Sequence, residues 1–321
     1  RCNTVEKRSS AFFMNGGAGR VLSSIPAFEI YEKENPDDDF IIVCEGGMEM
    51  LAGHPTLHKR CFDNWHKDLF EKYIKHRHCI TLEPYRIWEY YNQKASITQA
   101  FDIQMSNKGV RDLGDPTIYL SSIESAEGYN IIKDVKEKSA KQRVIAMQPY
   151  GRSSQRVGEE LIDVGGRSFR TQDVVKIVKK LQQKYAIIMM TEHPADFQKM
   201  GCPDPVAQPE GAPLRIWGGI IKAADCFLGC DSVGQHMAYA LGTPAVVCIG
   251  ATFQENISYP DSKKFQVLDL GGDQRVYDPI RISMEDEKMR TNDGIMSLSD
   301  AAVNEIVKEI DTIVSNNLRG K

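Results

Sequence analysis

The stretch from Ala223 to Gly250, AADCFLGCDSVGQHMAYALGTPAVVCIG, decides the fold of this chain. Its pattern predicts an apolar strand at Cys226 to Gly229, a polar turn at 230–232, and a helix from Val233 to Leu241. A Gly-Thr-Pro stop and a second apolar strand, Ala245 to Ile249, follow. Strand, helix and strand at this spacing are typical of a βαβ unit, because parallel strands need a crossover of about this length.

The turn after the first strand of this unit carries a cluster of polar residues. In open α/β sheets, ligands bind at the carboxyl ends of the strands, where helix N-termini present unpaired N–H groups. We expect these residues to lie there: Asp231, Ser232, Gly234, Gln235 and His236. The side chain of Asp231 or Ser232 is also predicted to cap the helix, and capping alone would account for this pair.

The composition is that of an ordinary globular protein with two domains. The chain has 321 residues, of which 41% are hydrophobic and 26% charged, and its net charge of -4 argues against a chain-wide footprint for nucleic acid. No run approaches the roughly 18 apolar residues of a membrane span. The N-terminal RCNTVEKRSS lacks a signal-peptide core, and no cysteine pair has C-x-x-C spacing. We therefore expect reduced thiols and a cytoplasmic location.

Both halves of the sequence alternate strands with helices. The first half opens with a strand at Ala11 to Asn15, the glycine turn Gly16-Gly17-Ala18-Gly19-Arg20, a helix at Val21 to Glu34 and a buried strand at Phe40 to Cys44, a Rossmann-like start. Strands in the second half are predicted at Arg143 to Gln148, Ala186 to Met190 and Phe265 to Leu270, with weaker ones at Tyr119 to Ser122 and Arg215 to Trp217. A linker is expected within Asn107 to Pro116.

The segment from Asp231 to Thr252 resembles the signature of the heptosyltransferase-like glycosyltransferases, glycosyltransferase family 9, which have the GT-B fold. That signature joins an Asp-Ser-Gly turn, a histidine, an Ala-Leu-Gly-x-Pro helix end and a strand closing on Gly-x-Thr. The matching positions are Asp231, Ser232, His236, Leu241-Gly242, Pro244, Gly250 and Thr252, whereas Val233 replaces the family's glycine. GGAGRVLSSIPAF is similar to the family's N-terminal loop, and GATFQENISYP to glycosyltransferases encoded by tailed phages.

The resemblance implies an α/β protein of two Rossmann-like domains facing each other across a cleft. Residues 1–110 would form the acceptor domain, 111–298 the nucleotide-sugar domain and 299–321 a closing helix. It implies a metal-independent, inverting transferase without a cofactor, whose acceptor hydroxyl belongs to a glycan or lipopolysaccharide-like saccharide. Besides the cluster at 231–236, the expected donor-binding residues are Gly17, Gly19, Arg152, Ser153, Ser154, Glu192 and Thr252.

The catalytic base is where the sequence departs from the family. The family's aspartate, taken as the base, corresponds to Arg20, which cannot accept a proton near neutral pH. Either another carboxylate or histidine acts as the base, or the acceptor needs less activation, or Arg20 binds the donor phosphates. Glu45 ends the second strand and is the preferred base, ahead of Glu49, His54 and Asp63.

Other functions fit parts of the sequence. Gly17, Gly19 and Glu45 form two-thirds of a dinucleotide fingerprint whose third glycine is replaced by Leu22, which leaves an NAD-binding enzyme as an alternative. A catalytically inactive sugar- or nucleotide-binding module would explain Arg20. A transferase acting on hydroxymethylated bases of phage DNA would need a basic groove, for which the available cations are Lys59, Arg60, Lys67, Lys72, Lys75 and Arg77.

A metal site is not expected. Five histidines lie within a short stretch, at His54, His58, His66, His76 and His78. Pro55 interrupts the first pair, and no cysteine or carboxylate falls at ligand spacing.

Overall fold

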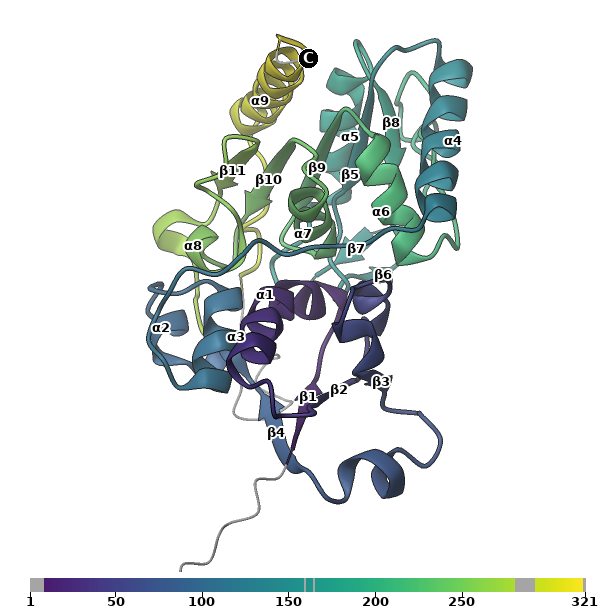
Figure 1. Cartoon of the computed structure of the whole chain (residues 1–321). Helices are drawn as coiled ribbons and strands as arrows, with labels where there is room; N and C mark the ends of the chain where they lie inside the picture. The colour runs from purple at the N-terminus through teal and green to yellow at the C-terminus, as the bar shows by residue number, and fades with distance from the viewer. Residues whose placement is uncertain (1–8, 159, 164, 281–291, 320–321) are drawn as a thin grey trace, which may run out of the picture. The chain divides into compact units, whose positions relative to one another are not determined.

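The computed structural model describes residues 9–158, 160–163, 165–280 and 292–319. The chain divides into two compact units, the first ending at Tyr119 and the second beginning at Leu120 (Figure 1). The predicted domain boundary at residue 110 lies within the first unit.

The first unit contains a parallel sheet with the strand order β3-β2-β1-β4. Its strands are β1 (Ser10–Met14), β2 (Ile41–Cys44), β3 (Cys61–Asp63) and β4 (His78–Leu82). Its helices are α1 (Ala18–Glu34), α2 (Trp88–Tyr91), α3 (Ile97–Ser106), the 3₁₀ helices η1 (Met48–Leu51), η2 (Leu57–Lys59) and η4 (Pro84–Arg86), and the π-helix η3 (Phe70–Ile74). The predicted Rossmann-like start is confirmed.

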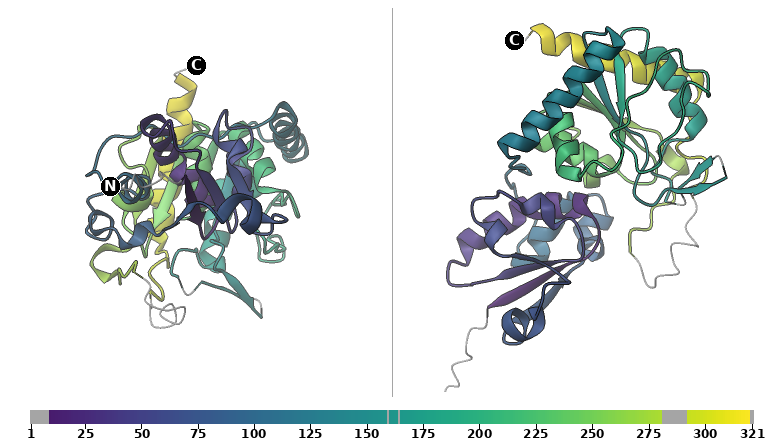
Figure 2. Two further views of the ribbon diagram at one scale, coloured as in Figure 1. Left: turned by 60° about the horizontal axis from the view of Figure 1, so that its bottom comes forward. Right: turned by 90° about the vertical axis from the view of Figure 1, so that its right-hand side faces the viewer.

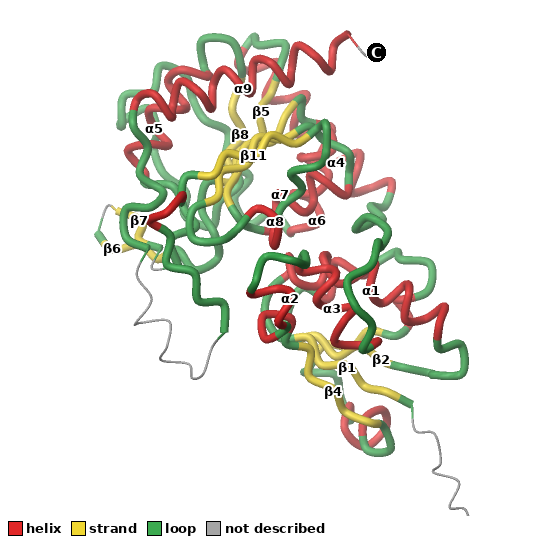
Figure 3. The backbone as a smooth tube through the Cα atoms, turned by 90° about the vertical axis from the view of Figure 1, so that its left-hand side faces the viewer, coloured by secondary structure: helices red, strands yellow, loops and turns green. Residues whose placement is uncertain are grey.

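Figure 3 shows α1 and α3 on one side of the strands of this sheet. Alternating side chains of β1 pack on its two opposite faces. On one face, the Phe12 ring lies 5.6 Å from the ring of Phe28 in α1 and 5.9 Å from that of Phe40. On the other face, Ala11 belongs to an apolar cluster with Leu69 and Ile74 of the segment around η3. Both faces of β1 are therefore covered, as a continuous apolar strand requires.

The second unit contains a parallel sheet with the strand order β11-β10-β9-β5-β8. Its strands are β5 (Val144–Gln148), β8 (Ala186–Met189), β9 (Cys226–Cys230), β10 (Ala245–Ile249) and β11 (Phe265–Asp269). Its helices are α4 (Ser122–Ser139), α5 (Thr171–Leu181), α6 (Leu214–Ala223), α7 (Val233–Ala240), α8 (Gln254–Ile257), α9 (Asp300–Arg319) and the short η5 (Gly272–Gln274).

Helices cover both faces of this second sheet (Figures 1 and 2). The apolar sides of α5 and α9 bury one face, where Val178 and Ile306 pack with strand residues such as Leu228 in one core. The other face is covered by α4, α6 and α7. This is a doubly wound α/β sheet, and the βαβ unit predicted from 226 to 249 is β9-α7-β10.

Two weak strands predicted from the sequence are wrong. Residues 119–121 have no strand structure, and α4 begins at Ser122 behind a capping box in which Ser121 and Glu124 bond each other's backbone N–H groups. Residues 215–217 belong to α6, because Gly219 does not break this helix but packs against Gly128 of α4. A Cβ placed on Gly128 would lie 2.1 Å from the backbone of Gly219, so the two helices touch through their glycines.

A β-hairpin after β5 was not predicted. Its strands β6 (Gln155–Val157) and β7 (Glu160–Ile162) pair antiparallel, and Gly158, a turn residue directly after β6, has a φ of 66°. All cysteines in the described residues carry free thiols, and Cys44, Cys226 and Cys248 are buried in strands as expected. None of the helices in the described ranges is both long and apolar enough to cross a membrane.

Candidate functional site

The second sheet gathers most of the predicted donor-binding residues at one edge. Because β10, β9, β5 and β8 are parallel neighbours, the segments that follow them leave from the same edge. Arg152, Ser153 and Ser154 follow β5, and Glu192 follows β8. Asp231 and Ser232 follow β9, and Thr252 follows β10. The parallel topology thus brings four separate segments of the chain together, as the sequence pattern predicted.

Asp231 ties two of these segments together, those that follow β9 and β10. Its Oδ2 accepts the hydroxyl proton of Thr252 at 3.0 Å, and its Oδ1 accepts the side-chain amide of Gln235 at 3.1 Å. Gln235 in turn accepts the hydroxyl of Ser258 at 2.8 Å. Asp231 is buried, and this burial raises the pKa of its carboxyl above the ordinary value. The carboxylate therefore holds the turn after β9, the start of α7 and the loop after β10 in place.

The start of α7 is capped by a residue that the sequence did not indicate. Ser232 is the N-cap residue, but neither its side chain nor that of Asp231 accepts an N–H of the first turn, so the predicted local cap is wrong. Instead, the backbone N–H of Gly234 donates to the side-chain Oε1 of Gln148 at 2.8 Å, and the Nε2 of Gln148 donates to the Ser232 hydroxyl at 3.0 Å. The cap comes from the end of β5, because that strand lies beside β9.

Gly234 is required by this contact. A Cβ at Gly234 would lie 2.3 Å from the Gln148 Oε1 and 2.6 Å from the ring of Phe227. The glycine therefore allows a close approach, and the approaching group is the side chain of Gln148 at the end of β5.

His236 is buried against Tyr259. Its Nδ1 lies 2.7 Å from the Tyr259 hydroxyl, and only 4% of the residue is exposed. Desolvation lowers the pKa of His236 to about 4, so its imidazole is neutral at neutral pH. The Tyr259 ring stacks on that of Tyr239 at 3.6 Å. A neutral His236 is a hydrogen-bonding residue here and adds no positive charge to the site.

The loops before and after the β6-β7 hairpin are built around Asp163. Its carboxylate accepts hydrogen bonds from the Ser153 hydroxyl at 2.8 Å, the Gly165 N–H at 2.9 Å and the Ser168 N–H at 3.0 Å. Desolvation alone would raise the pKa of Asp163, but the Ser168 hydrogen bond and the nearby Arg167 outweigh it and lower that pKa. Ser154 is buried and donates its hydroxyl to the Gly151 carbonyl at 2.7 Å. Ser153 and Ser154 thus shape the loop itself.

Two predicted donor residues are exposed side chains. Arg152 and Glu192 have no hydrogen bond or ion pair with the part of the chain that the structure describes. Both residues follow strands that end at the same sheet edge as β9, but neither side chain is hydrogen bonded to Asp231.

The glycine turn of the first unit lies beside Glu45. The Gly16 N–H donates to the Glu45 Oε2 at 3.1 Å, and Glu45 is exposed at the end of β2. A Cβ at Gly47 would lie 2.5 Å from the Cα of Ala18, so the segment after β2 packs on the start of α1. Gly17 is the N-cap residue of α1, so no side chain caps this helix, and Gly19 lies in the first turn of α1. The carboxyl ends of β1 and β2 therefore share one edge, which carries an accessible carboxylate.

Arg20 is held by its own unit. Its Nη2 donates to the Leu82 carbonyl at 3.1 Å and lies 3.6 Å from Glu83, and its guanidinium lies 4.9 Å from the Tyr85 ring centre. Only 14% of the side chain is exposed. These contacts hold Arg20 against the end of β4 and the residues that follow it, so Arg20 has a packing role within the first unit.

One of the histidines of the first unit, His54, and four of its cations have intramolecular partners. His54 lies 3.1 Å from Glu29, and its Nδ1 accepts the Thr56 and Leu57 N–H groups. Four of the cations considered for a DNA groove form ion pairs, namely Arg60 with Glu32, Arg77 with Asp39, Lys72 with Asp68 and Lys75 with Glu71. Such pairs reduce the positive field available to a phosphate backbone. Within the described ranges, no cluster of three or more His, Cys, Asp or Glu residues is arranged to hold a metal ion.

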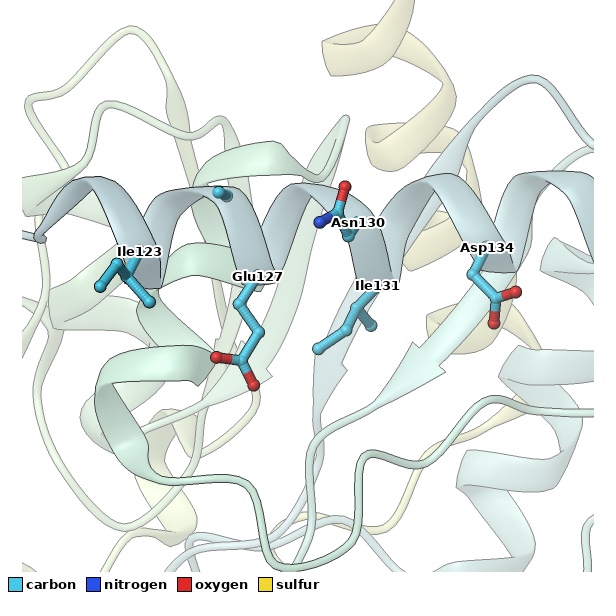
Figure 4. Close-up of a pocket in the computed structure, with 6 residues that line it drawn as sticks. Ile123, Glu127, Asn130, Ile131 and Asp134 are labelled. Carbon is cyan, nitrogen blue, oxygen red and sulfur yellow. The ribbon is translucent and has the colours of Figure 1, made fainter.

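A hollow along α4 contains none of the predicted site residues. Figure 4 shows Ile123, Glu127, Asn130, Ile131 and Asp134 lining it from this one helix. Ile123 is 77% exposed, so this hollow is open surface.

Two Rossmann-like units of parallel strands alternating with helices define this chain as a member of the GT-B class of folds. No protein-family model matches the sequence, and no curated protein matches it. Among solved structures, the chain is similar to a glycosyl transferase of family 9 from Veillonella parvula, with a TM-score of 0.64, 11% identity, and coverage of 98% of this chain and 100% of that one.

Two heptosyltransferases from E. coli share this fold. ADP-heptose lipopolysaccharide heptosyltransferase II has a TM-score of 0.58 and 12% identity, with 96% of this chain and 99% of that one covered. Heptosyltransferase WaaC with ADP has a TM-score of 0.54 and 12% identity, with 95% of this chain and 99% of that one covered. The fold expected from the resemblance at 231–252 is confirmed over nearly the whole chain.

Proposed function

We propose that this protein is a glycosyltransferase that moves a sugar from a nucleotide-sugar donor to an acceptor hydroxyl. The observation that carries the proposal is the convergence of the segments after β5, β8, β9 and β10 at one sheet edge, within a fold shared with family 9 glycosyltransferases. Ligands of doubly wound sheets bind at this edge. One structural neighbour, the E. coli heptosyltransferase WaaC, was solved with ADP, and a nucleoside diphosphate is the leaving group that a nucleotide sugar would release here.

The reaction we propose is a direct displacement that inverts the anomeric carbon and needs no metal. The acceptor oxygen forms a bond to the anomeric carbon while the bond from that carbon to the phosphate oxygen breaks. The nucleoside diphosphate departs with the bonding electrons, and a base takes the acceptor proton. Donors aimed at the departing phosphate stabilise its growing charge.

Glu45 is the base that we propose. It is an exposed carboxylate at the carboxyl end of β2, and the Gly16 N–H bonds one of its oxygens at 3.1 Å. That bond orients the carboxylate and leaves its other oxygen to accept a proton. Arg20 has no such capacity. We further propose that the acceptor is a saccharide bound by the first unit, and that the donor is bound by the second.

A panel of nucleotide sugars tests the proposal, because a donor that binds the folded state raises the midpoint of thermal unfolding. The expected result is stabilisation by one nucleotide-sugar class, and by its nucleoside diphosphate, at concentrations far above the dissociation constant. The Glu45→Gln variant should retain this shift and lose transfer by about 100-fold or more. Glu49→Gln, four residues away, serves as the control and should transfer normally. Stabilisation by no member of the panel would refute the proposed function, and normal transfer by Glu45→Gln would refute the base.

A further inference from the structure

Arg167 contacts Ser153, one of the predicted donor residues, although no sequence motif singled out Arg167. Its Nη2 donates to the Ser153 hydroxyl at 2.9 Å. Its guanidinium carbon would lie 3.9 Å from a Cβ placed on Gly151. The planar group therefore lies against the backbone that leaves β5, on the loop that carries Arg152, Ser153 and Ser154.

The positive charge of Arg167 also acts on the carboxyl of Asp231, in the turn after β9. Burial raises the pKa of Asp231, and the positive charge of Arg167 is the largest influence that opposes this rise. Arg167 is likewise the cation whose charge lowers the pKa of Asp163. Its charge thus acts on carboxylates from two segments that are far apart in sequence and that leave neighbouring strands, β5 and β9.

Neutral groups already satisfy these two carboxylates. Asp163 accepts hydrogen bonds from Ser153, Gly165 and Ser168, and Asp231 accepts them from Thr252 and Gln235. None of these five hydrogen bonds involves Arg167, so a substitution of Arg167 leaves all of their donors and acceptors in the chain.

The other candidates for an anion contact are less suited. Arg152 is exposed and is held by no partner in the described chain, so binding would first have to order a long side chain. The Gly234 N–H at the start of α7 already donates to Gln148. Arg167 is half-buried and already oriented by Ser153.

We propose that Arg167 binds the diphosphate of the nucleotide sugar, and that Ser153 orients its guanidinium for this contact. The inference rests on the proposed function. A guanidinium presents a planar fork of N–H donors that matches phosphate oxygens, and it stays charged at any physiological pH. It would also stabilise the negative charge that grows on the leaving diphosphate.

The test compares two arginines of the same loop region. Wild type, Arg167→Met, Arg167→Lys and Arg152→Met are titrated with ADP, UDP, GDP and CDP. The nucleoside of the preferred diphosphate is then titrated on its own. We expect Arg167→Met to weaken diphosphate binding by about tenfold or more and to leave nucleoside binding within about twofold. The diphosphate affinity of Arg167→Lys should lie between those of wild type and Arg167→Met, because lysine keeps the positive charge and lacks the planar fork of N–H donors. Arg152→Met, the rival candidate from the same loop region, should weaken diphosphate binding less than either Arg167 variant.

Three results would overturn the inference. These are wild-type diphosphate affinity in both Arg167 variants, equal weakening of nucleoside and diphosphate binding, and a larger loss in Arg152→Met than in either Arg167 variant. If Arg167→Met does not fold, Arg167→Lys decides, since it preserves the charge beside Asp231. A wild-type protein that binds none of the four diphosphates refutes the proposed function itself, and the Arg167 inference with it.

Discussion

The side-chain oxygen of Gln148 accepts the backbone N–H of Gly234 at 2.8 Å, so a neutral side chain from β5 caps the first turn of α7. A helix N-terminus carries a partial positive charge, and a neutral cap leaves that charge uncompensated for an anionic ligand. The Gln148→Glu variant keeps an acceptor at this position and adds a negative charge. We predict that its diphosphate affinity falls by about tenfold or more, measured by titration.

The stability of Gln148→Glu separates this effect from unfolding. Gln148 is 5% exposed, so a carboxylate there loses solvation but gains from the helix N-terminus. We expect these effects to offset each other to within about 1 kcal/mol in urea unfolding. Gln142→Glu, at an exposed position just before the opposite end of the same strand, is the matched control and should bind normally. Unchanged diphosphate affinity in Gln148→Glu would show that α7 does not attract the ligand.

The sequence predicted each end of β9, α7 and β10 to within one residue. This was possible because strands buried on both faces appear as uninterrupted apolar runs, and Leu241-Gly242-Thr243-Pro244 marks the helix end clearly. The parallel topology then determined that residues 152–154, 192, 231–232 and 252 leave one edge. Placement of site residues on elements was therefore predictable without side-chain coordinates.

The start of α4 was missed although its signal was present. Ser121 and Glu124 have the spacing of a capping box, but the weakly apolar residues before them suggested a strand. For α6, Gly218 and Gly219 suggested a boundary, because glycine weakens an isolated helix. The contact between Gly219 and Gly128 joins positions far apart in the chain and has no local signature.

Side-chain contacts between segments were the part that the sequence could not supply. Gln148 reaches Gly234 across 86 positions, and Arg143 pairs with Asp225 across 82. Arg167 follows a hairpin that was itself unpredicted, so nothing indicated that its guanidinium would return to Ser153. Residue type and strand position predict which segments meet, but not which side chains bond.

The Asp231→Asn substitution should destabilise the second unit. Both carboxylate oxygens accept hydrogen bonds, from Thr252 and Gln235, whereas an asparagine offers one acceptor and directs an N–H₂ group at the other donor. We predict a loss of about 1–3 kcal/mol in urea unfolding, the usual cost of an unsatisfied buried group. Thr252→Val removes a single bond and should cost less. Stability of Asp231→Asn within about 0.5 kcal/mol of wild type would contradict the network.

The Gly219→Ala substitution tests the contact between α4 and α6. A Cβ at this position would lie 2.3 Å from the backbone carbonyl oxygen of Glu124, which cannot move without separating the helices. Although alanine favours a helix more than glycine does, we predict a net loss of about 1–3 kcal/mol by chemical denaturation. Gly114→Ala is the control, because a Cβ there meets nothing within 4 Å. A Gly219→Ala protein as stable as Gly114→Ala would rule out the close approach.

The Glu124 carboxylate makes the second unit sensitive to acid. Arg215 donates to it from Nε at 2.5 Å and from Nη2 at 2.8 Å, and these hydrogen bonds lower the pKa of Glu124 from 4.5 to about 2. A group whose pKa is lower in the folded state adds stability above its unfolded pKa. That contribution disappears as the pH falls from about 4.5 towards 2.

We therefore predict that Glu124→Gln is less stable than wild type at pH 7 and that this difference shrinks as the pH falls to 2, where about half of the wild-type carboxyls are protonated in the folded state. Thermal unfolding followed by circular dichroism between pH 2 and 7 measures this, and we expect a difference of about 2–5 °C at neutral pH. Glu127→Gln, on an exposed position of the same helix, should follow the wild-type curve throughout. A constant gap between Glu124→Gln and wild type at every pH would mean that the capping bond to Ser121, and not the charge beside Arg215, is what the substitution removes.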